Sequence, residues 1–272
     1  MTDFSQKYGP WALVAGGAQG IGEAWSRYIA ERGVNVIALD REQTALDRIK
    51  RQLPEEFGVK CLPVRVDLSD DDMLEQVVDA VGNREVGLLV YNAAIADVGP
   101  FFKENTGLDF ERARIAVNVT GPTVLTYHFA KPMLRRRAGG IVFMSSGAGM
   151  KGAAFYSAYS ATKAHGINLA EALWYEFRPY NVDVLAVVAG MTLSTAARDF
   201  EHLDTSAFQT PEECVAEAMT VFGKEPCIIS GEAHRAGHEQ LAQLPNTVAV
   251  EAMAQNALND FLGGTPPPQA LD

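Results

Sequence analysis

The sequence predicts an α/β protein built around one doubly wound parallel sheet with helices on both faces. Short apolar runs alternate along the chain with longer stretches of helical periodicity. The runs are hydrophobic almost throughout, which is typical of strands covered on both sides. The first run also leads directly into a glycine-rich turn and a helix, the arrangement that opens a Rossmann-type sheet.

The expected elements follow one another in regular alternation. Apolar runs predict strands at residues 11–16, 34–39, 60–66, 86–91, 140–145 and 182–188. Helical spacing predicts helices at residues 21–32, 42–52, 70–81, 109–137 and 155–178. After residue 189 we expect a mobile stretch, a helix at about 211–222, a short strand at 227–230 and two further helical segments.

The chain has 272 residues and shows neither a repeat of fixed period nor a linker between two domains. We therefore expect a single domain over residues 1–262, with the substrate-binding segment at about 191–262. Residues 263–272 are rich in Gly and Pro and are expected to be disordered.

Composition excludes several classes of protein. The net charge of -11 would repel nucleic-acid phosphates at long range. The three cysteines form neither a disulfide framework nor a zinc pattern, which favours a reducing cytoplasm. The start of the chain does not resemble a signal peptide, and the longest apolar stretch, residues 182–193, is too short to span a bilayer. We expect a cytoplasmic protein with no nucleic-acid, membrane or metal partner.

The glycine-rich turn predicts a dinucleotide site. Glycines permit a tight turn and let backbone N–H groups approach a pyrophosphate at a helix N-terminus. The alternative, an ordinary strand-to-helix turn, is disfavoured because a strand precedes the turn, a helix follows it and an acid ends the next strand. The residues expected to contribute are Gly16, Gln19, Gly20, Ile21 and Gly22.

The acid that ends the second strand is Asp40. A carboxylate about twenty residues after the loop accepts hydrogen bonds from the ribose 2′-hydroxyl and repels a 2′-phosphate. NAD is therefore favoured over NADP. Arg41 is the counter-argument, because an arginine pairs with a phosphate, although the glycine loop itself holds no basic residue.

Several motifs in the expected order resemble the short-chain dehydrogenase/reductase family over most of residues 11–195. The loop from Ala15 to Gly22 is similar to the family's TGxxxGxG, and Ser146 precedes Tyr159 and Lys163 at the interval of its serine and YxxxK pair. Asn118 resembles the family's catalytic asparagine. The resemblance implies oxidation and reduction between a secondary alcohol and a ketone, with Asn118, Ser146, Tyr159 and Lys163 catalytic.

The resemblance also implies cofactor contacts beyond the loop and Asp40. These are Asp67 and Leu68 beside the adenine, Asn92, Ala93 and Ala94 at a strand end, Tyr159 and Lys163 at the nicotinamide ribose, and Thr192, with Met191 and Ser194, near the carboxamide and diphosphate. It further implies a homo-oligomer, a tetramer or dimer, formed through the two long central helices.

The chemistry explains these residue types. Hydride transfer needs a base that takes the alcohol proton, and an ammonium one helical turn away is expected to lower the pKa of the Tyr159 phenol. The Ser146 hydroxyl would hydrogen-bond the substrate oxygen, and Asn118 would hold a water that links Lys163 to solvent. Tyr156 has Ser160 rather than a cation four residues on, so it is assigned to the pocket lining or to packing.

Three positions depart from the family pattern without removing a reacting group. Ala15 replaces a threonine, Ala94 replaces a glycine and Ala189 replaces the proline before Gly190. The opening of the chain is also similar to lipid-carbonyl reductases of the family, so an apolar substrate is preferred. Its specificity is expected to depend on the stretch after Thr195 and on Met150, Phe155 and Tyr156.

Other interpretations remain open at this point. The protein is alternatively a non-catalytic NAD-binding redox sensor, or an epimerase or dehydratase on the same scaffold. His234 and His238 have metal-ligand spacing but no third ligand, so a solvated helix face is favoured. Cys214 and Cys227 lack an activating neighbour and are assigned to packing.

Overall fold

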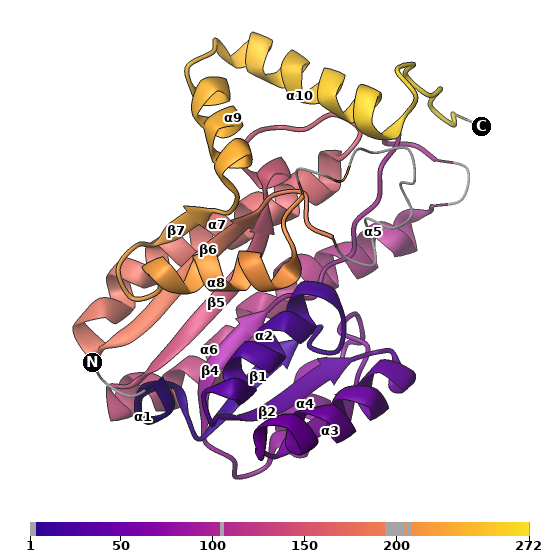
Figure 1. Ribbon diagram of the computed structural model, residues 1–272. Coiled ribbons are helices and arrows are strands. Elements are labelled where there is room, and N and C mark those ends of the chain that lie inside the picture. Colours follow the sequence, from indigo (N-terminus) through magenta and orange to yellow (C-terminus); the bar gives the residue numbers. More distant parts are fainter. Residues whose placement is uncertain (1–3, 104–105, 194–204, 206–207, 272) are drawn as a thin grey trace.

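A computed structural model describes residues 4–103, 106–193, 205 and 208–271. Its centre is a seven-stranded parallel sheet in the order β3-β2-β1-β4-β5-β6-β7 (Figure 1). This confirms the predicted doubly wound sheet. The strands are β1 (Trp11–Ala15), β2 (Asn35–Asp40), β3 (Cys61–Arg65), β4 (Val86–Tyr91), β5 (Gly139–Ser146), β6 (Val182–Ala189) and β7 (Cys227–Ile229).

Helices cover both faces of the sheet, and their apolar residues form two separate cores. One core contains residues of α4 (Met73–Val81), α6 (Gly121–Arg136) and α7 (Ser157–Phe177). The other contains residues of α2 (Gly20–Glu31), α3 (Gln43–Phe57) and α8 (Pro211–Val221). The remaining helices are α1 (Phe4–Tyr8), α5 (Leu108–Ile115), α9 (Glu232–Ala242) and α10 (Asn246–Phe261).

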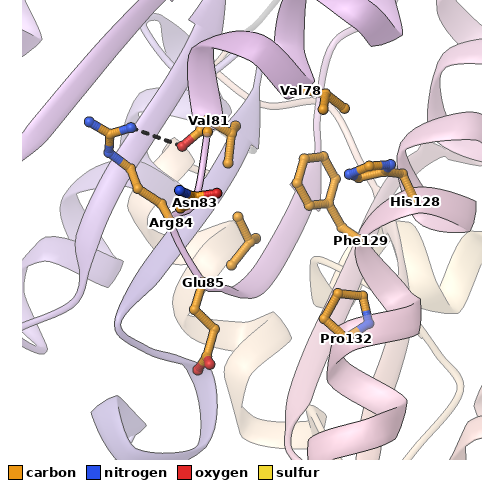
Figure 2. Close-up of a pocket in the computed structure, with 10 residues that line it drawn as sticks. Val78, Val81, Asn83, Arg84, Glu85, His128, Phe129 and Pro132 are labelled. Carbon is orange, nitrogen blue, oxygen red and sulfur yellow. Dashed lines mark hydrogen bonds between the residues drawn. The ribbon is translucent and has the colours of Figure 1, made fainter.

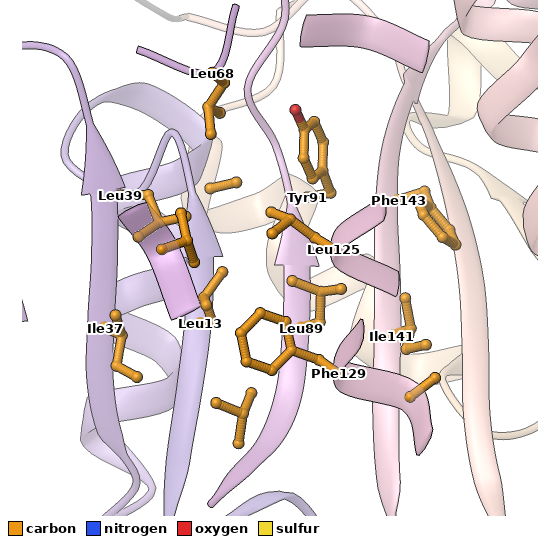
Figure 3. Close-up of a cluster of buried hydrophobic side chains, with 14 of the residues drawn as sticks. Leu13, Ile37, Leu39, Leu68, Leu89, Tyr91, Leu125, Phe129, Ile141 and Phe143 are labelled. Carbon is orange, nitrogen blue, oxygen red and sulfur yellow. The ribbon is translucent and has the colours of Figure 1, made fainter. Parts of the chain in front are cut away.

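The strands supply both cores because successive side chains point to opposite faces. In β1, Leu13 lies in the first core and Val14 in the second. Figure 3 shows the first core, where Leu125 and Phe129 of α6 pack over Leu89 and its neighbours on the sheet. Burying one such side chain fully stabilises the fold by about 1.5–3 kcal/mol, so this two-sided packing holds the strand ends in place.

The helix expected over residues 109–137 is interrupted. Between α5 and α6 the chain forms a π-helical turn, η1 (Ala116–Thr120). The Tyr91 hydroxyl reaches this turn and donates a hydrogen bond of 2.6 Å to the Val117 carbonyl, and a Cβ at Gly121 would lie 2.1 Å from the Tyr91 oxygen. A side chain inserted into the helical hydrogen-bond ladder is a known cause of such a break.

The C-terminal region after β7 consists of α9, α10 and an extended tail that lie beyond the carboxyl edge of the sheet (Figure 1). The tail contacts the loop after β4, where Ala270 N–H donates to the Phe102 carbonyl at 3.0 Å and Phe102 N–H donates to Gln269 Oε1 at 2.9 Å. The disorder expected for residues 263–272 stays a prediction. Most of the stretch expected to be mobile, residues 194–204 and 206–207, lies outside the described residues.

A cavity of about 210 Å³ lies between α4, the loop before β4 and α6 (Figure 2). Its lining includes Arg84, Glu85, His128 and Phe129. It opens near the amino end of β4 and contains none of the predicted site residues, so it is separate from the site described below. Among the described helices, none is both long enough and apolar enough to cross a membrane.

Candidate active site

The turn between β1 and α2 forms a cradle that only glycine fits. Gly16 has φ +70°, and its N–H donates to the Leu39 carbonyl at 2.8 Å. A Cβ at Gly22 would lie 1.8 Å from the Gly16 carbonyl oxygen. The turn therefore approaches α2 too closely for any side chain at position 22. Gln19, Gly20 and Ile21, at the start of α2, present their backbone toward the same edge of the sheet.

Beside this cradle the chain order reverses, between β1 and β4, and in open α/β sheets a crevice lies outside the carboxyl ends of the strands at such a point. Asn92 Nδ2 donates to the Gly16 carbonyl at 3.1 Å, and Ala93 N–H donates to the Ala15 carbonyl at 2.9 Å. Ala94, the next residue, is exposed at the crevice. In open α/β sheets this switch point is where nucleotide ligands bind, so the predicted residues of both strands do meet there.

At the end of β2, the Asp40 carboxylate accepts hydrogen bonds from the Ala18 N–H at 3.2 Å and the Glu42 N–H at 3.1 Å. Arg48 is not available to a phosphate at this edge, because it pairs with Glu23 and donates to the Ala18 carbonyl. Arg41 is mostly exposed and lies 3.7 Å from the Glu42 carboxylate. Arg65, the partner of Asp40 on β3, is also exposed and donates to the Arg41 carbonyl at 3.4 Å, so the edge presents one fixed carboxylate and two exposed arginines.

Asp67 and Leu68 follow β3 on the same side of the sheet. Asp67 accepts hydrogen bonds from both the N–H and the hydroxyl of Ser69, which lower the pKa of its carboxyl. Leu68 is buried in the first core. Asp67, the exposed residue of the pair, is therefore held by its own turn, and the buried Leu68 anchors that turn.

Three predicted catalytic residues come together at the carboxyl end of β5 and the start of α7. A hydrogen bond joins the side chains of Tyr159 and Ser146. The Lys163 Nζ lies 5.7 Å from the centroid of the Tyr159 ring and donates to the Met144 carbonyl at 2.8 Å. The i, i+4 spacing on α7 produces this proximity, and Ser145 fixes the helix to β5 by donating to the Lys163 carbonyl at 2.9 Å.

The electrostatics differ from the sequence-based expectation. Burial raises the pKa of the Tyr159 phenol, and the hydrogen bond with Ser146 offsets only part of that rise. Burial also lowers the pKa of Lys163 to about 8. The expected lowering of the Tyr159 pKa by Lys163 is therefore wrong for this structure, since the lysine amine is bonded to a carbonyl and desolvation is the larger effect.

Asn118 lies in η1 and is 6 % exposed. Its Oδ1 accepts a hydrogen bond from Ile95 N–H at 2.8 Å, while its Nδ2 donates to the Ile95 carbonyl at 2.9 Å and to Thr162 Oγ1 at 3.0 Å. The amide thus links the loop after β4, the π-helical turn and α7. The alternative interpretation of Asn118, a helix-bend asparagine that bonds the backbone, agrees with its place in η1 and its bonds to Ile95. Its catalytic role stays a prediction.

Thr192 is buried beyond β6, where its hydroxyl donates to the Gly190 carbonyl at 3.0 Å. Met191 beside it is exposed, and Ser194 and Thr195 lie outside the described residues. Phe155, ahead of α7, has φ +63°, and its carbonyl accepts a hydrogen bond from Gly99 N–H at 2.9 Å. Tyr156 packs edge-on against Phe261 of α10, with ring centroids 5.8 Å apart.

The prediction that His234 and His238 form a solvated helix face is wrong. Their Nε2 atoms lie 3.0 Å apart, and each lies within 2.5 Å of where a Cβ at Gly147 would be. His234 also packs against Gly190, and burial lowers the pKa of both imidazoles, that of His238 to about 4. The spacing of the pair was visible in the sequence, but the two glycines it packs against are remote in the chain.

The cysteines and potential metal ligands add no further centre within the described part of the chain. Cys61, Cys214 and Cys227 are unpaired, and burial raises the pKa of each thiol, so the reactive thiolate is disfavoured. No group of three or more His, Cys, Asp or Glu side chains among the described residues could hold a metal ion. The packing assignment for Cys214 agrees with its place in the second core.

The fold, the glycine cradle and the Ser146, Tyr159 and Lys163 cluster define an oxidoreductase class. A family model described as short chain dehydrogenase matches residues 10–204. The chain belongs to the short-chain dehydrogenase/reductase family, whose members typically use NAD(P) and act on CH–OH groups. It is accordingly an enzyme that interconverts an alcohol and a carbonyl compound.

Particular relatives refine this picture. The chain is 29% identical to a 7beta-hydroxysteroid dehydrogenase of Mediterraneibacter gnavus over 238 residues, 85% of this chain and 89% of that protein. It is 29% identical to a very-long-chain 3-oxoacyl-CoA reductase of Macaca fascicularis over 79% of this chain and 69% of that one. A solved structure from work on 7beta-hydroxysteroid dehydrogenase stereoselectivity superimposes with a TM-score of 0.87 at 27% identity, covering 93% of this chain and 99% of that chain.

Proposed function

We propose that the protein catalyses the NAD(H)-dependent interconversion of a secondary alcohol and a ketone on a large, apolar substrate. The observation that carries the proposal is the meeting of Tyr159, Ser146 and Lys163 at the carboxyl edge of the sheet, beside a glycine cradle suited to a dinucleotide. A bound dinucleotide would supply or accept the hydride. The chain's own task is then to hold the substrate oxygen and move its proton.

In the reducing direction, Tyr159 donates its phenolic proton to the carbonyl oxygen as that oxygen gains negative charge. Burial favours the neutral phenol, which is the form that can donate. Ser146 donates a second hydrogen bond to the same oxygen. The Lys163 ammonium, when it turns from the Met144 carbonyl toward the ribose and the phenol, stabilises the phenolate left behind.

Asn118 and Thr192 complete the proposed machinery. The Asn118 amide fixes α7 relative to the loop after β4, which supports its assignment beside Lys163 on a route for the proton to solvent. Thr192 lies just beyond β6, within the segment assigned to the carboxamide and diphosphate of the cofactor. We therefore include Asn118 and Thr192 in the proposed active site together with Tyr159.

The preference for NAD over NADP follows from the end of β2. The Asp40 carboxylate is held by two backbone N–H groups, so it stays where a 2′-phosphate would have to lie. Arg48, an arginine near the loop, is already paired with Glu23. Arg41 and Arg65 favour the phosphorylated cofactor, since Arg65 is exposed beside Asp40 on β3 and donates to the Arg41 carbonyl. The position of Arg41 next to Glu42 weakens its effect.

The size and polarity of the substrate are inferred from the surroundings of the site. Phe101, Phe102, Met150 and Met191 expose large apolar side chains on segments that border the crevice. The relatives act, by their names, on hydroxysteroids and very-long-chain 3-oxoacyl-CoA. A rigid polycyclic ketone or a long-chain ketone is therefore the proposed substrate. We also propose a homo-oligomer through α6 and α7, where Tyr127 and Tyr175 are exposed.

A ketone panel tests this function. We expect oxidation of NADH, followed by its absorbance, with steroid ketones and long-chain 3-oxoacyl thioesters, and at least about tenfold lower kcat/KM with small ketones such as acetone. The ratio of kcat/KM with NADH to that with NADPH should exceed about ten. NADH binding without turnover of any ketone or alcohol would instead support a redox sensor, and a ratio below one would overturn the cofactor assignment.

The pH dependence is expected to differ between the two directions. Alcohol oxidation should accelerate as the pH rises toward about 8, because it needs the Tyr159 phenolate and burial holds that pKa above its ordinary value. Above about pH 8 the loss of the Lys163 proton should oppose this rise. Ketone reduction should be constant below about pH 8 and fall above it, as Lys163 loses its proton. Steady-state rates in overlapping buffers of constant ionic strength measure both profiles. Parallel profiles in the two directions would contradict the roles of Tyr159 and Lys163.

A further inference from the structure

Glu217 on α8 is the centre of a polar cluster outside the reacting groups. Its Oε1 accepts a hydrogen bond from Arg235 Nη1 at 2.8 Å, and its Oε2 accepts from Gly231 N–H at 2.8 Å and from Gln209 Nε2 at 2.9 Å. These donors outweigh burial and lower the pKa of the carboxyl to about 2. Glu217 is therefore ionised at neutral pH and has donors from three directions.

Gln209, one of these donors, belongs to the segment that is expected to bind the substrate. Gln209 N–H donates to the Met191 carbonyl at 3.2 Å, and Leu193 N–H donates to the Gln209 carbonyl at 2.8 Å. Thr192 and Gln209 form a parallel bridge between the same two stretches. The two described ends of the 191–209 segment are thus joined to each other, and the Gln209 side chain joins both to Glu217.

The buried hydroxyl of Ser230 reinforces this link. Its oxygen lies 2.6 Å from Gln209 Oε1 and 3.2 Å from Glu217 Oε2. A hydroxyl donates a single proton, so the shorter contact is the donated bond. Ser230 consequently holds the Gln209 amide in the orientation in which its nitrogen faces the carboxylate, and this leaves the Gln209 amide bonded at both its oxygen and its nitrogen.

The other two donors fix α9. Gly231 precedes the helix, and Arg235 in its first turn also donates to the Ile229 carbonyl at 2.7 Å. His234, the residue before Arg235 in α9, packs against Gly147 and Gly190, the residues that follow Ser146 and Ala189. A displacement of α9 therefore changes the contacts of the residue next to the catalytic serine.

We propose that Glu217 is a positioning residue for the substrate: it holds residues 191–193, through Gln209, and α9 in place at the carboxyl ends of β5 and β6. The proposal rests on the proposed function, because residues 191–193 and α9 are taken to border the bound ketone. Glu217 touches neither the reacting groups nor the glycine cradle. Its influence is therefore on substrate binding and on Thr192, the assigned cofactor contact that bridges to Gln209, and it does not act on the transferred proton directly.

The substitution Glu217→Gln tests the proposal, since it keeps the size of the side chain and removes its charge. We expect KM for the best ketone of the panel to rise about tenfold, with kcat changed by less than about threefold. The Kd for NADH, measured by fluorescence, should rise by a smaller factor than KM, because Thr192 alone of the assigned cofactor contacts bridges to Gln209. The matched control is Glu212→Gln, the same change at an exposed position of the same helix. It should leave all three quantities unchanged.

A second variant and a second measurement keep the test decisive. Gln209→Met removes the bond from Gln209 to Glu217 and the bond that the Gln209 amide accepts from Ser230, and it leaves the two donors from α9 in place. It should reproduce the rise in KM even if Glu217→Gln fails to fold. Hydrogen exchange of the Leu193 and Gln209 amides should accelerate in both variants without any substrate present. Unchanged KM and exchange in folded variants would overturn the proposal. Accelerated exchange in a protein that reduces no ketone would instead refute the proposed function alone.

Discussion

Replacement of Tyr159 by phenylalanine is expected to lower kcat for ketone reduction by about two to four orders of magnitude, the usual contribution of a general acid. The ring would still fill its place at the start of α7, so the crevice keeps its shape. The hydroxyl that bonds Ser146 and delivers the proton would be lost. Because that hydroxyl does not contribute to the glycine cradle, the Kd for NADH should change by less than about threefold.

The matched control removes a phenolic hydroxyl elsewhere in the same part of the chain. Tyr180 lies in the 3₁₀ turn after α7 and is 45% exposed, so Tyr180→Phe should leave kcat and KM unchanged. Stopped-flow single turnovers with both variants would separate the chemical step from product release. Full activity of Tyr159→Phe, or an equal loss in Tyr180→Phe, would remove Tyr159 from the mechanism.

The second large effect is expected at the glycine cradle. A methyl group at Gly22 would lie 1.8 Å from the Gly16 carbonyl oxygen and 2.7 Å from Asn92 Nδ2, so Gly22→Ala must push the turn away from the start of α2. Overpacking of this kind costs about 1–3 kcal/mol. If that strain falls on the cofactor-binding conformation, the Kd for NADH should rise by about ten- to a hundredfold.

Gly166→Ala is the control for this change. Gly166 lies in the middle of α7, where an added Cβ meets nothing within 4 Å, and alanine favours the helix. That variant should bind NADH normally and melt at a slightly higher temperature. Isothermal titration and thermal melts of the two variants measure the contrast. Normal NADH affinity in Gly22→Ala would show that the cofactor does not use this turn.

The fold was predictable because local patterns and packing agree. The apolar run at Val86–Tyr91 is a strand with the predicted bounds, and its six residues are all buried. The break between α5 and α6 could not be predicted, since it depends on the Tyr91 hydroxyl meeting a helix that lies far along the chain. The first helix, Phe4–Tyr8, was also missed, because five residues are too few to show a helical period.

The site was predictable where its residues are close in sequence or tied to strand ends. Tyr159 and Lys163 share one helix, and the glycine cradle is a single turn, so their spacing determines their geometry. The raised pKa of Tyr159 was not predictable, because it depends on burial by the whole fold. The contacts of Glu217 with Gln209, and of His234 with Gly147 and Gly190, were not predictable either, because these partners come from separate parts of the chain.

The hydrogen bonds of Asn118 have a consequence for motion. One amide group joins the segment after β4, the widened turn and the helix that carries Tyr159. A motion that moves the loop after β4 away from α7 must break these bonds. Otherwise the loop, the π-helical turn and α7 must move together. We expect the wall on the β4 side and the proton-donating helix to fluctuate as one body, so that substrate entry depends on movement of the opposite side.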